Sequence, residues 1–224
     1  MTEKFRHEHD LLGDMMVPAG AYYGVQTMRA IEDFPITGLK IDRALIMAMA
    51  IVKKAAARAN MDVGLLPEDK ARAIMDAATE IIEHIDLHKW FVVDPIQGGA
   101  GTSINMNTNE VIANRALELL GEEKGNYKVI SPNTHVNMSQ STNDAFPCGL
   151  HLAAIIRLDM LIGNLEKLIE SFENKAKEFG NAIKMGRTHL QDAVPIRFSQ
   201  EFLAYAAVLK RDLVRIKKVQ ENLY

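Results

Sequence analysis

Apolar residues recur at helical spacing through most of the chain. After Pro67 they form a stripe made of Ala71, Ile74, Met75, Ala78, Ile81, Ile82 and Ile85. This spacing predicts a helix with one buried face, and Pro67 followed by two acidic residues is typical of a first helical turn. The same reasoning predicts helices from about residue 42 to 60 and from about residue 110 to 120.

Two longer helices are predicted in the second half of the chain. The first runs from about residue 145 to 179, with a seam at Ala154, Leu158, Leu161, Leu165, Leu168, Phe172, Ala176 and Phe179. The seam of the second is Phe198, Phe202, Tyr205, Leu209, Leu213, Ile216, Val219 and Leu223. Steps of four and three are typical of helical bundles. The last helix is still in phase at Tyr224 without a cap, so we expect a chain cut in mid-helix.

These elements predict a mainly α fold with two domains. Residues 1–143 are expected to form an N-terminal, mostly helical domain. Residues 144–224 are expected to begin a central long-helix bundle that is truncated. The first forty residues look turn-rich and irregular, and residues 21–27 are predicted to be a short strand or an extended arm.

Composition and charge narrow the class of protein. Apolar residues make up 48% of the 224 residues and charged residues 25%, as in ordinary soluble domains. The net charge of −3 gives no basic footprint for nucleic acid or a membrane surface. The single cysteine excludes an internal disulfide and favours a cytoplasmic location. The longest apolar run, residues 44–52, is too short to span a bilayer, and the charged first residues are no secretory signal.

Three polar stretches are candidates for the chemistry, namely residues 98–110, 139–145 and 186–193. Each is rich in hydroxyls or amides, and each is expected to lead into a helix. A helix N-terminus presents free N–H groups and a positive dipole end, so three such ends together would bind a small dicarboxylate. The alternative is that these residues are ordinary helix caps; three examples in one chain, each longer than a cap requires, favour the anion site.

Other candidate sites are weaker. The glycines at 98, 99 and 101 do not follow dinucleotide-site spacing, and no parallel-strand pattern surrounds them. His7, Glu8 and His9 could hold a metal ion, but a solvated terminus explains them better. We therefore predict no metal and no cofactor.

The three stretches also carry a family resemblance. GAGTSINMNTNEVIANRALELLG, SQSTNDAFP and MGRTHLQDAVP, in this order, closely resemble the aspartase/fumarase superfamily, from about Leu11 to the end of the chain. The segments AYYGVQT, QGGAGTS, NMNTNE and STND look most like the aspartase branch. Class II fumarases usually read QTGSGT, NMNVNE and SSND instead of the last three.

The resemblance implies a lyase that reversibly eliminates ammonia from L-aspartate to give fumarate. The anti elimination proceeds through a carbanion that a neighbouring carboxylate stabilises as a dianion, so hydrogen-bond donors must bind that dianion better than the ground state. The positions that match the family's substrate contacts are Thr102, Ser141 and Thr142 for this carboxylate, and Asn143, Thr188 and His189 for the amino group and the other carboxylate.

Two family features are missing. The general base of the family is a serine on a loop of the GSSxMPxKxN type, and no such segment occurs here. We therefore expect a fragment without a catalytic base, inactive in isolation. Many fumarases carry His and Asp where Ser131 and Thr134 stand, so their accessory anion site is not expected and His135 is interpreted as structural. The resemblance also implies a homotetramer whose active sites are each built from three subunits.

Two alternatives remain open at this point. A class II fumarase would add water instead of ammonia, and turnover of malate rather than aspartate would identify it. A non-catalytic helical assembly module would keep the fold without the chemistry, and succinate binding without turnover would identify that. Neither alternative involves nucleic acid or a membrane.

Overall fold

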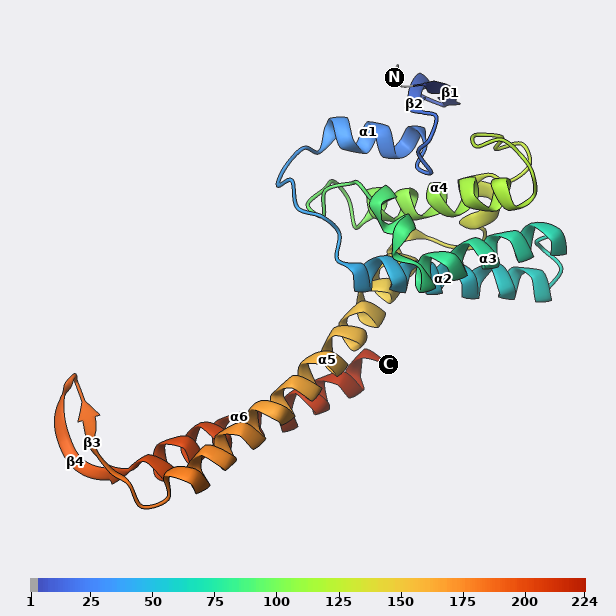
Figure 1. Cartoon of the computed structure of the whole chain (residues 1–224). Helices are drawn as coiled ribbons and strands as arrows, with labels where there is room; N and C mark the ends of the chain where they lie inside the picture. The colour runs from blue at the N-terminus through green and yellow to red at the C-terminus, as the bar shows by residue number, and fades with distance from the viewer. Residues whose placement is uncertain (1–3) are drawn as a thin grey trace. The chain divides into compact units, whose positions relative to one another are not determined.

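The computed structural model describes residues 4–224 and has two compact units, one ending at Ala153 and one spanning Ala154–Tyr224 (Figure 1). The first unit holds β1 (Phe5–Asp10), β2 (Gly13–Pro18), α1 (Val25–Asp33), α2 (Arg43–Asp62), α3 (Glu68–Glu83), η1 (Ile85–Trp90), α4 (Thr102–Leu119) and the short π-helix η2 (Pro132–Val136). Helix α5 (Thr142–Phe179) begins in the first unit and continues into the second, which adds β3 (Ile183–Thr188), β4 (Gln191–Arg197), α6 (Phe198–Gln220) and η3 (Glu221–Leu223). The predicted domain boundary, between residues 143 and 144, falls in the first turn of α5.

The prediction of a mainly helical fold is confirmed. Within residues 4–224, the only sheets are two antiparallel two-stranded hairpins, β1–β2 and β3–β4. Helix α2 lies close to its predicted bounds, and α3 contains the predicted stripe except Ile85, which begins η1 and is exposed. The Asp42 carboxylate accepts a hydrogen bond from the N–H of Ala44 at 2.8 Å and so caps α2.

Helix α4 lies at the centre of the first unit, in contact with α1, α2, α3 and η2 (Figure 1). Because neighbours surround it, polar as well as apolar residues of α4 are buried. The buried polar residues are Ser103, Asn105, Asn107, Thr108, Asn109, Glu110 and Asn114. Buried polar groups need hydrogen-bond partners, so α4 becomes the centre of a polar network.

The predicted start of α4 was wrong by about two turns. The helix begins at Thr102 rather than near residue 110, so most of the first polar stretch is helical. Gly101 precedes it in the left-handed conformation, with φ of 82°, which glycine adopts without a steric penalty. The asparagines and threonines resembled a loop because they lack an apolar helical period. In the helix they are buried, and hydrogen-bond partners compensate for the burial of their polar groups.

The irregular N-terminal segment was also predicted wrongly. Residues 5–18 form the β1–β2 hairpin, and the second half of the 21–27 segment begins α1 at Val25. Two buried carboxylates accept hydrogen bonds at this helix start. Glu110 accepts from the N–H groups of Gly24, Gln26 and Thr27, and Glu8 accepts from that of Val25. These carboxylates lie far from the helix start in the sequence, so the local pattern of residues did not predict the helix.

In the second unit, α5 and α6 pack as an antiparallel pair. Phe179 stacks on Phe202 with ring centroids 5.6 Å apart, and Phe172 lies 5.5 Å from Tyr205. The ion pair Lys217–Glu166, at 2.8 Å, continues the pairing toward the end of α6. Several apolar side chains of this unit are exposed, among them Leu161, Leu168, Leu203, Val208 and Val214.

Helix α5 also contains one stretch of eighteen residues, with mean hydropathy 1.6, that is long and apolar enough to cross a membrane. Only 22% of that stretch is buried in this structure. Core helices of bundles share this length and composition.

Candidate functional site

The starts of helices α4 and α5 adjoin each other in the first unit. The Nδ2 group of Asn105, in the first turn of α4, donates to Oγ1 of Thr142 in the first turn of α5 at 3.1 Å. Gly101 lies so close to the Phe146 ring that a Cβ atom there would be 2.2 Å from Phe146 Cδ1. The structure therefore brings the first and second polar stretches together.

The start of α4 keeps hydrogen-bond donors available. The Gln97 side chain accepts from the N–H of Ile104 at 3.0 Å, which satisfies one donor of the first turn. In the described part of the chain, the N–H groups of Thr102 and Ser103 have no partner. The Thr102 side chain is exposed. These donors can serve a negatively charged ligand.

The start of α5 supports both interpretations of the second stretch. The Ser141 oxygen accepts a hydrogen bond from the N–H of Asn143 at 3.2 Å, so Ser141 is a helix cap. A hydroxyl that accepts can still donate its own proton outward. Ser141 and Asn143 are exposed and Thr142 is half-buried, so capping and ligand binding are compatible here.

Behind these donors lies a buried lysine that the sequence analysis missed. The side chain of Lys53, on α2, is fully buried, and its Nζ donates to amide oxygens of Asn105 at 2.7 Å, Asn137 at 2.9 Å and Gln140 at 2.9 Å. Burial disfavours the charged form and lowers the pKa of Lys53 to about 7. The three amides link α2, α4 and the segment before α5 into one network.

A signal for Lys53 was present in the sequence. The apolar run of residues 44–52 ends directly before Lys53, which makes this lysine look like the polar end of the run. However, Lys53 follows Ile46 and Met49 by steps of seven and four, and Asn60 follows it by seven, so all four share one helical face. A lysine in phase with a buried stripe indicates a buried charge.

The remaining polar residues of NMNTNE have structural partners. Asn107 accepts from the N–H of Val92 at 3.0 Å and donates to the carbonyl of Trp90 at 3.0 Å. Asn109 donates to Asn137 at 3.2 Å, while its own oxygen is buried without a partner among the described residues. Burial raises the pKa of Glu110 to about 7. The N–H bonds that Glu110 accepts favour its charged form and oppose this rise, but burial is the larger effect.

The third polar stretch does not start a helix, which corrects the prediction. Thr188 ends β3, and His189 lies in the tight turn of the β3–β4 hairpin, with α6 beginning only at Phe198. His189 and Leu190 have φ of 49° and 62°. Two consecutive left-handed residues are typical of a type I′ hairpin turn, which usually contains Gly or Asn. Such strain at non-glycine residues is frequent at functional sites.

Thr188 and His189 are both exposed. They belong to the second unit, so their grouping with Thr102 and Thr142 stays a prediction. Close by, Arg187 forms an ion pair with Asp192 at 2.6 Å across the hairpin.

The segment around Ser131 has local partners. The Ser131 hydroxyl accepts from the N–H of Thr134 at 3.1 Å, and Nδ1 of His135 accepts from the N–H of Ser131 at 2.8 Å. Burial, together with the charge of Lys70, lowers the pKa of His135. These contacts are consistent with the structural role expected for His135. Across residues 4–224 no cluster of three or more His, Cys, Asp or Glu side chains is suited to a metal ion.

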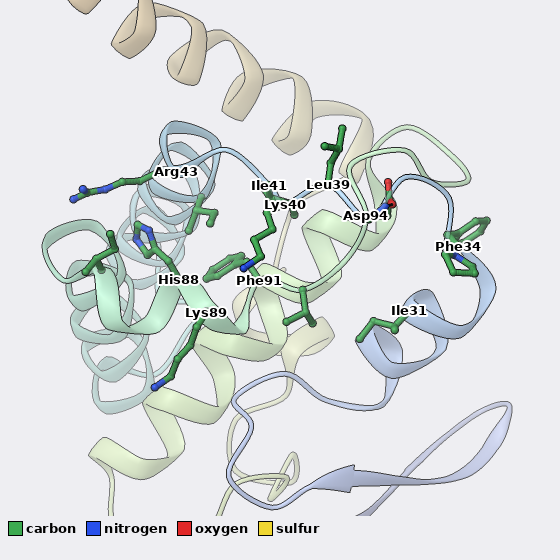
Figure 2. A pocket seen from close by; sticks show the side chains of 15 residues that line it. Ile31, Phe34, Leu39, Lys40, Ile41, Arg43, His88, Lys89, Phe91 and Asp94 are labelled. Carbon is green, nitrogen blue, oxygen red and sulfur yellow. Dashed lines mark hydrogen bonds between the residues drawn. The ribbon is translucent and has the colours of Figure 1, made fainter.

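A separate hollow of about 730 Å³ opens between the α1–α2 connection and the segment around η1 (Figure 2). Phe34, Ile41 and Phe91 line it, and Lys40 and Arg43 are among its polar residues. It contains none of the predicted substrate contacts. The Asp94 carboxyl is turned to the connection, where it accepts from the N–H groups of Thr37 and Gly38. Burial opposes its ionisation, but these bonds and that from Ile96 outweigh burial and lower the pKa of Asp94 to about 2.

Comparison with known proteins assigns the family. Residues 13–224 match the lyase family, and the chain belongs to that family. An aspartate ammonia-lyase from a Bacillus species is 60% identical over 227 residues, covering 100% of this chain and 48% of that protein. A class II fumarate hydratase from Halobacterium salinarum is 50% identical over 229 residues, covering 100% of this chain and 47% of that protein. The resemblance stated from the sequence is confirmed.

A solved structure supports the same family. The structure of a fumarate lyase:delta crystallin from Brucella melitensis matches with a TM-score of 0.94 at 50% identity, over 98% of this chain and 51% of that chain. This chain spans about half the length of the curated relatives it matches.

Proposed function

We propose that these residues belong to an ammonia lyase that converts L-aspartate reversibly to fumarate and ammonia. The observation that carries the proposal is the meeting of the α4 and α5 starts, where Asn105 of α4 bonds to Thr142 of α5. Relatives named aspartate ammonia-lyase, at 60% and 58% identity, favour this substrate.

The chemistry explains why such a site needs many donors. A base removes the weakly acidic Cβ proton, the electron pair forms the double bond, and the Cα–N bond breaks with ammonia as the leaving group. Between these events the charge resides on the β-carboxylate as a dianion. Donors at Thr102, Ser141 and Thr142 would stabilise that dianion more than the ground-state carboxylate, which lowers the barrier.

The other substrate contacts belong to the same proposal. Asn143 at the α5 start, and Thr188 and His189 at the hairpin tip, would bind the amino group and the α-carboxylate. The exposed apolar side chains of α5 and α6 favour partner subunits, and the family resemblance suggests that these form a homotetramer with shared sites. We also propose that one domain spans residues 1–143 and that the second begins at residue 144, near the start of α5. We further propose that the protein is cytoplasmic.

The substrate test compares aspartate with malate. The product of the complete reading frame that contains this sequence is expected to release fumarate from L-aspartate and to leave L-malate nearly untouched. Fumarate absorbance and an ammonia assay on each substrate measure this. Faster turnover of malate would overturn the choice of substrate and favour a class II fumarase, to which a 50% identical relative belongs by name.

The 224 residues alone are expected to form no fumarate, because they contain no segment like the family's serine loop. Positioning and anion stabilisation without a placed base do not remove a weakly acidic proton. Succinate binding measured by calorimetry on the same sample is the control for an intact half-site. Ammonia release by this chain would show that a base lies within it; succinate binding by an equally inactive complete product would favour the assembly module.

A further inference from the structure

The buried ammonium of Lys53 has only neutral partners. Its three hydrogen bonds go to the amide oxygens of Asn105, Asn137 and Gln140, and no carboxylate among the described residues pairs with it. An unpaired buried charge is costly to a fold, more so than an apolar residue of the same size. Core packing therefore does not explain Lys53.

One of the three bonds connects Lys53 to the proposed site. The Asn105 oxygen accepts from Lys53, and this fixes the orientation of the Asn105 amide, whose nitrogen donates to Oγ1 of Thr142 at 3.1 Å. A hydroxyl oxygen that already accepts from Asn105 has its proton free for another acceptor. At the adjoining helix starts, an oxygen of a bound ligand would be such an acceptor.

The other two bonds hold the segment that leads to Ser141. Asn137 and Gln140 both accept from Lys53, and the Asn137 amide donates to the carbonyl of Gln140 at 3.0 Å. Ser141 follows directly. The same ammonium thus orders both helix starts from behind.

We propose that Lys53 is a positioning residue for this site: through Asn105 it fixes the Thr142 hydroxyl as a donor to the substrate carboxylate, and its charge balances a dianionic ligand. The inference rests on the proposed function. The lowered pKa of Lys53 agrees with an ammonium that has no anionic partner among the described residues.

Two variants of the complete protein test the relay. Lys53→Met removes the charge and the three bonds and is expected to lower kcat for aspartate by roughly tenfold or more, with a smaller change in KM, because the dianion forms after binding. Asn105→Asp keeps the size and gives Lys53 an ionic partner. It is expected to keep the thermal midpoint, yet lower kcat similarly, because a carboxylate accepts the Thr142 proton and neutralises Lys53.

Lys54→Met is the matched control, because it removes the same charge from the neighbouring position of α2, and its kcat should stay within about threefold of wild type. A double-mutant cycle with Thr142→Val separates positioning from folding. If Lys53 acts through Thr142, then Lys53→Met or Asn105→Asp has little further effect on kcat in the Thr142→Val background.

The outcomes are distinct. Full activity of both variants would overturn the role of Lys53, and losses that add to that of Thr142→Val would overturn the relay through Thr142. Either result leaves the proposed function intact. If Lys53→Met does not fold, Asn105→Asp decides by itself. A wild-type protein that neither releases ammonia nor binds succinate would overturn the proposed function, and this inference with it.

Discussion

Replacing Thr102, Ser141 or Thr142 with alanine is expected to lower the turnover of L-aspartate by roughly one hundredfold or more in the complete protein. That is the usual scale for the loss of one preorganised donor to a developing oxyanion. The adjoining helix starts place these hydroxyls where N–H groups already favour negative charge. His189→Ala should reduce both substrate affinity and turnover. Steady-state kinetics on each purified variant measure these effects.

Ser131→Ala is the matched control for Ser141→Ala. Both serines cap a helix by accepting a backbone N–H bond, at 3.1 and 3.2 Å respectively. Removing either cap should cost about 1 kcal/mol of stability, but only the Ser141 variant should lose turnover. If all variants of the site stay within about threefold of wild type, the polar stretches are caps and nothing more.

The helices were predictable wherever burial is one-sided. The stripe from Ala71 to Ile82 alternates with polar residues, so its period is visible in the sequence, and α3 follows it; the last predicted member, Ile85, lies beyond the end of α3. Helix α4 is covered by other elements on several sides and buries many of its own polar residues. It therefore shows no apolar period, and its asparagines resembled those of a loop. Their partners, such as Trp90 and Asn137, lie far away in the sequence.

The hairpin was missed for a different reason. Its turn contains His189 and Leu190, which local statistics do not associate with left-handed φ. The motif identified Thr188 and His189 as candidate ligands through resemblance, whereas the physical pattern alone suggested a helix start. Lys53 shows the converse: no motif included it, but its phase within α2 indicated burial.

Among glycine-to-alanine changes in the first unit, Gly101→Ala is predicted to be the most destabilising. Its φ of 82° disfavours any side chain, by roughly 1–2 kcal/mol. In addition, a Cβ atom would lie 2.2 Å from the Phe146 ring, and such overpacking costs typically about 1–3 kcal/mol more. The ring belongs to the second turn of α5, so the variant should also push the two helix starts apart.

Gly121, at the other end of α4, is the matched control. Its φ of 78° carries the same conformational penalty, but a Cβ atom added there would meet no other part of the described chain within 4 Å. Gly121→Ala should therefore lower the thermal midpoint by roughly 2–5 °C, and Gly101→Ala by roughly 5–15 °C. Circular dichroism melts of both variants measure the difference, and kinetics should show lost turnover for Gly101→Ala alone. Equal midpoints would mean that Phe146 moves aside without penalty, and that close packing of the two helix starts does not hold the donors in place.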